Sequence, residues 1–414
     1  MIRVPAPGGR CVVWRPAPAV RRPIMTARKH FKQLVRDRMA RTGEAYTVAR
    51  RHVEAGAPVH WELRGGVEGE TAAFANVLAN LGVEHDGAPL SEAMILGIGG
   101  GLGAGYILWE FDAWGYRALT LGFRRQWQYP ARWASGLAER LGLQAVLHET
   151  GGRKAAAAAL DAQLEQGLPA IAWIDPYQLG HRGLPESRDG FGGSPVVVYG
   201  RSGDSYLIDD RSTEREVVSA ERVADARARV SSYKHRLITI DPARVDVGDL
   251  RAAIEEGLRL QVEHLSEKSD SFSLPAWRKW ARMITDTRHK KGWPTVFADG
   301  RGTASARGSI YAGASGGAHL RGLYADFLDE ASALLGRELP SAPWREAAAR
   351  WEAIVDAALE PGDELRELID REDPARWSVQ AERDVAGEMP PLADEVTAMY
   401  EAEVAALDRL RAAL

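Results

Sequence analysis

Carboxylates stand at several points of the sequence where a helix should begin or a strand should end. Glu70 and Thr71 open an apolar-periodic stretch that predicts a helix, and Asp210 ends the run "SYLIDD". Binding and catalytic residues concentrate at such ends because the scaffold exposes them. Glu70 or Asp210 could serve as a general base. Two plainer interpretations stay open: Glu70 or Thr71 caps the helix, and Asp210 pairs across a turn with Arg211.

Other polar residues could bind a ligand, and Thr71, Ser194 and Arg211 are among them. Asp175, followed by Tyr177, ends the run "PAIAWID", and Asp209 stands next to last in "SYLIDD". His319 and Arg321 lie in "GGAHLRG", which we expect to begin a helix. A helix N-terminus and an Arg side chain both suit a phosphate or carboxylate. Packing in the core is the alternative for Arg321.

The stretch "SEAMILGIGGGLGAGYILWEF", residues 91–111, raises the question of a nucleotide-binding loop. Gly99, Gly101 and Ala104 match G-x-G-x-x-A, but that fingerprint needs a strand before the glycines. Ser91 is instead a good N-cap for a helix, and no GK[ST] follows. We therefore expect these glycines to permit close backbone packing rather than to cradle a phosphate.

Metal and cofactor sites are not predicted. His60, Glu62, Glu68 and Glu70 lie within eleven residues, but they lack the i,i+4 His pair that would suggest a metal site. The one cysteine, Cys11, excludes disulfides within the chain and cysteine-based zinc sites.

Composition is that of an ordinary globular protein. At 414 residues, with 45% hydrophobic and 27% charged residues, the chain can form two or three cores. Its apolar runs are shorter than the roughly 18 residues that span a bilayer, and no signal-peptide pattern opens the chain. We expect a cytoplasmic protein.

The N-terminal part is basic. Residues 1–52 carry a net charge of +11, which leaves −15 for the remainder. We expect 1–24 to be a disordered leader, with translation beginning at Met25, and 25–55 to be a basic helical module. Nucleic acid is one conceivable partner for this module. Docking on the acidic body or on a partner protein is the interpretation that we favour.

Two further domains are predicted, at 56–243 and 244–414. The first has helices and then a mostly antiparallel sheet, which is an α+β pattern. The second has only helical periodicity, and we expect its Gly-rich stretch 286–319 to be a long connection. The helices of the first domain are expected over 71–82, 91–99, 130–142 and 154–166, and its strands over 143–149, 169–175, 195–200, 205–210 and 235–241.

Several of these blocks together resemble a known family. "ETAAFANVLANLG", "SEAMILGIGGGLGAGY", "WID", "GGSPVVVYG" and "IDDRS" resemble, in this order, motifs of the butirosin biosynthesis protein H N-terminal domain family. "AWRKWARMITDTRHKKGWPTVF" and "GGAHLRGLYADFLDEA" are similar to the helical domain of unknown function that follows it. The resemblance covers about residues 56–360.

The resemblance implies a papain-like fold and an acyltransferase that moves an acyl group from a carrier protein to an aminoglycoside amine. That chemistry uses a helix-borne Cys, a strand-borne His and an orienting third residue. Counted back from Asn76, the Cys position is Gly69; the His position is Ser194, and the third position keeps Asp210. A covalent thioester here is therefore excluded. We expect the motif's glycines and tyrosine to shape the cleft: Gly69, Gly99, Gly100, Gly101, Gly103, Gly105 and Tyr106.

Three functions follow as hypotheses. The first is a non-catalytic or thiol-independent relative that binds a small molecule, a peptide or a carrier protein in a cleft between the two domains. The second is an active acyl or aminoacyl transferase that works without a covalent thioester, by positioning an amine beside an activated acyl group. The third is a nucleic-acid-associated protein that acts through the basic module. Whether the chain is an enzyme stays open.

Overall fold

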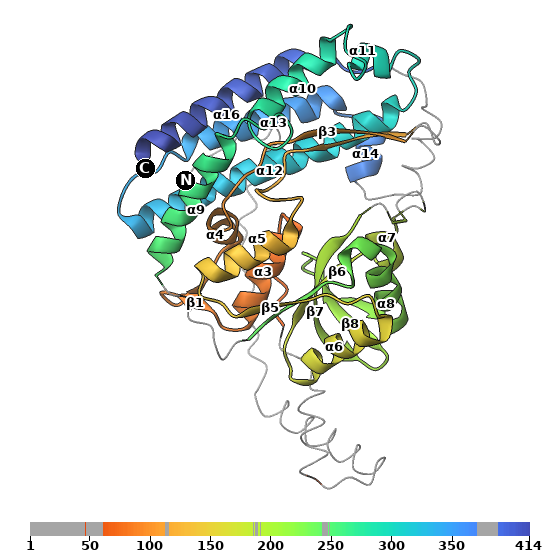
Figure 1. The fold of residues 1–414 in the computed structure, drawn as a ribbon, viewed down its shortest axis with the longest axis vertical. Coiled ribbons are helices and arrows are strands. Elements are labelled where there is room, and N and C mark those ends of the chain that lie inside the picture. Colours follow the sequence, from red (N-terminus) through yellow and green to blue (C-terminus); the bar gives the residue numbers. More distant parts are fainter. Residues whose placement is uncertain are drawn as a thin grey trace, which may run out of the picture. The chain divides into compact units, whose positions relative to one another are not determined.

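The computed structural model describes residues 46, 61–111, 116–184, 186, 189–190, 192–241, 247, 249–370 and 388–414 (Figure 1). The expected leader at 1–24 lies outside these residues, as does the expected basic module at 25–55 except for Tyr46, which is helical and exposed. Contacts place Pro58–Leu414 in one compact unit and Met1–Ala57 in another. The description below concerns the first unit.

Short helices and two hairpins precede the main sheet. The predicted helices appear within two residues of their expected starts. Helix α4 ends at a glycine run because Gly100 and Gly101 have φ values of +97° and +70°, which side chains other than hydrogen rarely allow. The elements are α3 (Gly69–Asn80), β1 (Glu84–His85), β2 (Ala88–Pro89), α4 (Glu92–Ile98), β3 (Tyr106–Phe111), β4 (Tyr116–Leu121) and α5 (Pro130–Arg140).

The main sheet is six-stranded and antiparallel throughout, in the order β5-β10-β6-β7-β8-β9. Alternate residues face different cores: Val197 and Tyr199 join the core that includes α3, whereas Val196 and Val198 join a smaller core under α6 and α8. The elements are β5 (Ala145–His148), α6 (Arg153–Glu165), β6 (Ala170–Ile174), α7 (Pro176–Leu179), β7 (Ser194–Ser202), β8 (Ser205–Asp209), β9 (Glu216–Ser219), α8 (Ala220–Arg229), η3 (Ser231–Tyr233) and β10 (Leu237–Ile240).

The C-terminal part is helical, as predicted; the described residues from 249 onward contain no strand. No described helix is both long enough and apolar enough to cross a membrane. The helices are α9 (Leu250–Leu265), α10 (Pro275–Thr285), α11 (Trp293–Val296), α12 (Thr303–Leu335), α13 (Ala342–Ala358), α14 (Glu364–Asp370) and α16 (Ala393–Ala413).

The expected long connection at 286–319 is wrong from Thr303 onward, because α12 starts there and runs for 33 residues. Its small residues serve packing instead of breaking the helix. A Cβ atom added to Gly317 would lie 2.6 Å from the Trp351 ring, so α13 can approach only a glycine there. Ser309 accepts a hydrogen bond from the backbone N–H of Leu119 at 2.8 Å, which ties the helix to β4.

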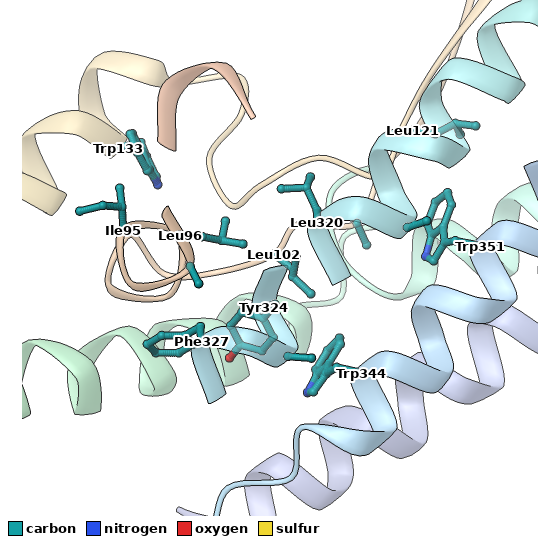
Figure 2. Packing of buried hydrophobic residues seen from close by; sticks show 14 of the residues in the cluster. Ile95, Leu96, Leu102, Leu121, Trp133, Leu320, Tyr324, Phe327, Trp344 and Trp351 are labelled. Carbon is teal, nitrogen blue, oxygen red and sulfur yellow. The ribbon is translucent and has the colours of Figure 1, made fainter. Parts of the chain in front are cut away.

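One hydrophobic core continues across the expected boundary at 243/244. Figure 2 shows members from both sides, among them Leu96, Leu102, Tyr324 and Trp344. The mixed α and β composition is therefore confirmed, with the sheet in the N-terminal part and helices after it. The exact domain boundaries stay a prediction.

Candidate functional site

The start of helix α3 is fixed by two carboxylates. Glu68 is the N-cap: its Oε2 accepts from the backbone N–H groups of Glu70 at 3.0 Å and Thr71 at 2.9 Å. The expectation that Glu70 or Thr71 is the cap is therefore wrong by two or three positions. An acid in either place suits the positive end of the helix dipole, so the sequence alone did not separate them.

Glu92, at the start of α4, holds the segment that leads into α3. Its carboxylate accepts from the backbone N–H groups of Val67 and Glu68, both at 2.8 Å, and from the Thr71 hydroxyl at 2.7 Å. Thr71 is fully buried by these contacts. Glu92, in the glycine-rich motif, thus positions the residues around Gly69.

Gly69 and Ser194 are neighbours in space although 125 positions separate them in the sequence. A Cβ atom built on Gly69 would lie 3.7 Å from Ser194 Oγ and 3.3 Å from Pro195 Cγ. A side chain on the first turn of α3 would thus meet a side chain at the start of β7. A Cys–His pair needs two side chains that meet in this way. Here Gly69 has only a hydrogen atom as its side chain, and Ser194 has a hydroxyl.

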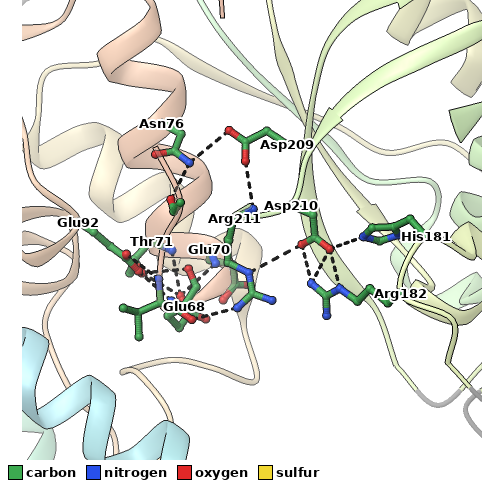
Figure 3. A network of polar contacts seen from close by, with 12 residues as sticks. Glu68, Glu70, Thr71, Asn76, Glu92, His181, Arg182, Asp209, Asp210 and Arg211 are labelled. Carbon is green, nitrogen blue, oxygen red and sulfur yellow. Dashed lines mark hydrogen bonds and ion pairs between the residues drawn. The ribbon is translucent and has the colours of Figure 1, made fainter. Parts of the chain in front are cut away.

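Asp210, one residue beyond β8, accepts from two side chains of the loop after α7 (Figure 3). His181 Nε2 lies 2.6 Å from its Oδ2, and Arg182 donates through Nε at 2.7 Å and through Nη2 at 2.6 Å. Because a carboxylate can only accept, Nε2 of His181 carries the proton. Burial alone would raise the pKa of Asp210, but the His181 hydrogen bond and the charges of Arg182 and Arg211 together lower it.

Helix-borne position 69, strand-borne position 194 and the acid at 210 thus occupy one region of the fold. Residues 68–211 match the protein family described as butirosin biosynthesis protein H, N-terminal. The resemblance inferred from the sequence is confirmed over these residues. A comparison with curated proteins gives no match.

His181 is the residue of this butirosin-protein-H-like segment that sequence reasoning missed. Its side chain is 7% exposed, and its Nδ1 is buried with no hydrogen-bond partner in the described part of the chain. The available signal was weak, since a histidine followed by an arginine in a loop has no periodicity. Only the fold brings it to Asp210, 29 positions away.

Glu70 points to a different partner. Its Oε2 accepts from Arg124 Nε at 2.6 Å and makes a second, shorter contact with Nη2 of the same guanidinium. Arg124 is fully buried and lies over the Trp133 ring, 4.2 Å from its centroid. Burial raises the pKa of Glu70 to about 7, against the opposing charge of Arg124. Glu70 is thus engaged in a buried ion pair.

Asp209 and Arg211 tie the end of β8 to the region of α3. Asp209 accepts from Trp61 Nε1 at 2.9 Å and from the Asn76 amide at 3.3 Å. The Arg211 guanidinium donates to the Val67 carbonyl at 2.9 Å, and its Nε lies 3.8 Å from Asp210 Oδ1. Pairing of Asp210 with Arg211, one of the two interpretations, is therefore present, but His181 and Arg182 are closer partners.

Asp175 organises the loop that carries His181. Its two oxygens accept from the backbone N–H groups of Gln178 and Gly190, each at 2.8 Å, and its side chain is fully buried. Tyr177 is half-buried on α7, and no described contact joins it to Gly69. Asp175 thus positions the loop, whereas ligand contact by either residue stays a prediction.

His319 and Arg321 do not stand at a helix start, so that expectation is wrong. Both lie in the middle of α12, where His319 is exposed and Arg321 is fully buried. Arg321 pairs with Glu403 of α16 at 2.7 Å and donates to the Gly103 carbonyl at 3.1 Å. The glycines before them suggested a break, but they belong to the helix; Gly317 packs closely against Trp351, whereas Gly316 has open space around it.

The family glycines do serve close packing. A Cβ atom added to Gly101 would lie 1.9 Å from Gln261 Oε1, and one added to Gly105 would lie 2.0 Å from the Phe123 ring. Three more of these glycines leave less than 3 Å for a Cβ atom: Gly99 beside Trp133, Gly100 beside Arg125 and Gly103 beside Arg124. The hydroxyl of Tyr106 accepts from Trp293 Nε1 at 3.0 Å, and burial raises the pKa of this tyrosine to about 12. Shaping of a ligand cleft by these residues stays a prediction.

Proposed function

We propose that the protein binds an acyl group carried on a phosphopantetheine arm, or the carrier that bears it, without forming a covalent bond to it. The site lies around Gly69, Ser194 and Asp210. The observation that carries this proposal is the adjacency of Gly69 and Ser194, because the two family positions meet but hold neither thiol nor imidazole. We place the protein in specialised metabolism on the strength of the family alone. The cytoplasm is the location that we expect from its composition.

We infer as well that the sheet part has a papain-like fold. In that fold a nucleophile at a helix start faces a base on a strand, and the orienting residue stands on the next strand. Position 69 at the start of α3, position 194 at the start of β7 and Asp210 after β8 agree with this order.

Two arginines would recognise the anionic part of such a ligand. Arg182 and Arg211 flank Asp210, and each side chain is 26% exposed. Both guanidinium groups are charge-assisted donors that suit a phosphate, although the carboxylates of Asp209 and Asp210 lie beside them. Arg211 also contacts Val67, two residues before Gly69, so a phosphate bound by Arg211 would keep the acyl chain close to the empty position.

A calorimetric titration tests this proposal. The ligand is a phosphorylated acyl-pantetheine in which an amide replaces the thioester, so that it cannot react. We expect saturable binding that Arg211→Ala weakens about 10- to 100-fold, the effect of losing a charge-assisted hydrogen bond. Arg259→Ala, which removes an exposed arginine of α9, is the matched control. Absence of binding, or equal losses in both variants, would contradict the proposal.

His181 favours a second candidate function, acyl transfer without a thiol. With Nε2–H bound to Asp210, the unpartnered Nδ1 can accept a proton. In this reaction the amine nitrogen attacks the thioester carbonyl, the C–N bond forms and the C–S bond breaks. The amine proton passes through His181 to the departing thiolate. Glu70 and Asp210 fit the role of base less well because arginines already hold both carboxylates.

Turnover separates the two candidates. An acyl-pantetheine thioester and an aminoglycoside are incubated with the protein, and the amide product is measured by mass spectrometry. Transfer by the His181 route requires product formation that His181→Gln abolishes while ligand binding remains. If ligand binds and no product forms, the protein acts as a binding relative.

A further inference from the structure

A small hollow lies between helices α6 and α8, away from the residues around Gly69. Tyr206 on its wall precedes Asp210 by four residues, roughly 13 Å along an extended strand. The hollow opens to solvent and is lined on both helices by alanines. Its polar lining consists of Arg153, Tyr206, Arg227 and His235.

Arg227 is the unusual member of this lining. It is only 4% exposed, and it donates to the backbone carbonyls of Ala156 and His235, each at 2.8 Å. Its Nε is buried and has no hydrogen-bond partner among the described residues. No ion pair joins Arg227 to a carboxylate of the described chain. The nearby charge of Asp161 favours the protonated guanidinium, but that carboxylate is itself bound to Tyr206 and Arg201.

The charge of Arg227 is retained. Burial lowers the pKa of Arg227 to about 10, so the guanidinium is protonated at neutral pH. A buried cation is costly when its charge is only partly compensated, because the protein interior solvates charge poorly. Here Asp161 is shared with the Arg201 guanidinium. A bound anion would offset that cost.

The other charges around the hollow do not neutralise it. Arg153, at the first position of α6, forms an ion pair with Asp225 at 2.5 Å. This ion pair neutralises Arg153 and leaves the charge of Arg227 unchanged. The first turn of α6 contains no acidic residue, so the positive end of its dipole adds to the field. His235, which is 9% exposed, brings no negative charge.

We propose that this hollow is a binding site for a small oxyanion, a phosphate or a carboxylate group, held by the buried Arg227. The argument does not depend on the acyl-binding proposal, since no residue is shared between the two sites. Free inorganic ions and the anionic group of a larger metabolite present the same chemistry to the guanidinium.

Thermal unfolding in inorganic phosphate tests the site. The full chain is melted in increasing phosphate and in increasing acetate, with sodium chloride at equal ionic strength as the reference. A ligand that binds only the folded state raises the Tm by about 3–5 °C at a hundredfold excess over its Kd. We expect a saturable rise with phosphate or acetate beyond the chloride reference. The anion that gives the larger rise in Tm identifies whether the site prefers a phosphate or a carboxylate group.

A substitution on α6 provides the internal test. Ala157 lines the hollow, whereas its neighbour Ala158 is exposed and does not. Ala157→Glu should place a carboxylate in the hollow, raise the Tm without added anion and remove the response to phosphate. Ala158→Glu adds the same charge to the same helix and should preserve the response. Arg227→Met should also remove it; if that variant does not fold, the alanine pair decides.

Two results would overturn the proposal. One is a Tm that follows ionic strength alone, with phosphate and acetate no better than chloride. The other is an equal response to phosphate in Ala157→Glu and Ala158→Glu. Neither result bears on acyl-pantetheine binding, because the calorimetric titration with Arg211→Ala reports on different residues.

Discussion

His181 Nε2 lies 2.6 Å from Asp210 Oδ2, so the acid at the family's third position keeps an imidazole partner although strand position 194 has none. The histidine comes from the loop after α7 and not from β7. A buried carboxylate needs hydrogen-bond donors for its lone pairs. His181 and Arg182 supply them here, and no thiol lies at position 69.

Loss of the Asp210 charge should destabilise the protein. Asp210→Asn breaks contacts with His181 and Arg182, and we expect a loss of about 2–3 kcal/mol in the free energy of unfolding measured in urea. Asp204→Asn, in the exposed turn between β7 and β8, is the control and should change it by less than about 0.5 kcal/mol.

The same variant has a pH signature. Because the folded-state pKa of Asp210 is lowered, its stabilisation is present above the unfolded pKa of about 3.9 and is lost as pH falls through the folded value. The difference between wild type and Asp210→Asn should therefore shrink at acidic pH. A difference that stays constant down to the acid transition would count against the paired carboxylate.

Glu70 should show the opposite dependence on pH. Its folded pKa is raised from 4.5 to about 7, so the folded state holds a proton that the unfolded state has lost within this window. Stability then falls as pH rises from 4.5 to 7, by at most about 3 kcal/mol. Glu70→Gln should remove this slope in urea titrations at several pH values. Parallel curves for the two proteins would show that Arg124 keeps Glu70 ionised throughout.

The buried pair of Arg321 and Glu403 should dominate the stability of the helical part. Glu403 also accepts from Trp277 Nε1 at 2.9 Å and from Trp351 Nε1 at 2.7 Å. We expect Glu403→Gln to cost about 3–5 kcal/mol, because it leaves a buried guanidinium without a counter-charge. Glu346→Gln in an exposed ion pair is the control. Tryptophan fluorescence in urea reports the change; equal midpoints for both variants would disprove it.

Much of the fold was readable from local patterns. The cap at Ser91, the glycine that ends α4 and the apolar runs of strands β6 to β8 all have short-range signals. The start of helix α12 was predicted too late because glycine and serine normally favour turns. The close approach of the Trp351 ring explains the glycine at position 317. The hairpin of β3 and β4 was not predicted. The hydrogen bond from the Leu119 backbone to Ser309 of α12, which supports this hairpin, is a long-range contact that the sequence does not reveal.

The assignment of Gly69, Ser194 and Asp210 to the family's catalytic positions stays a prediction. The structure shows that Gly69 and Ser194 are neighbours. Core packing, one of the two interpretations for Arg321, is confirmed by its burial. The ion-pair partners of Glu70 and Arg321 were not predictable, because Arg124 and Glu403 lie 54 and 82 positions away. Long-range ion pairs leave no periodic trace in a single sequence.

Gly101 should be far less tolerant than a glycine with the same backbone and open surroundings. Gly101 and Gly82 have φ values of +70° and +75°, but a Cβ atom meets Gln261 at the first and nothing within 4 Å at the second. Gly82→Ala should cost about 1 kcal/mol from backbone strain alone. Gly101→Ala should cost about 3 kcal/mol or more by adding a steric overlap. Equal unfolding midpoints in urea would contradict the packing role.

The absence of covalent chemistry is tested most directly by intact-protein mass spectrometry. The chain with Cys11→Ala is incubated with a short-chain acyl-pantetheine thioester, and Gly69→Cys with Ser194→His in the same background is the positive control. A Cβ atom at position 69 has its nearest neighbour at 3.3 Å, so the control side chain fits after a small shift of Pro195. We expect the acyl mass on the control alone. An acyl adduct mapped to residues 58–414 of the chain that keeps Gly69 would contradict the account.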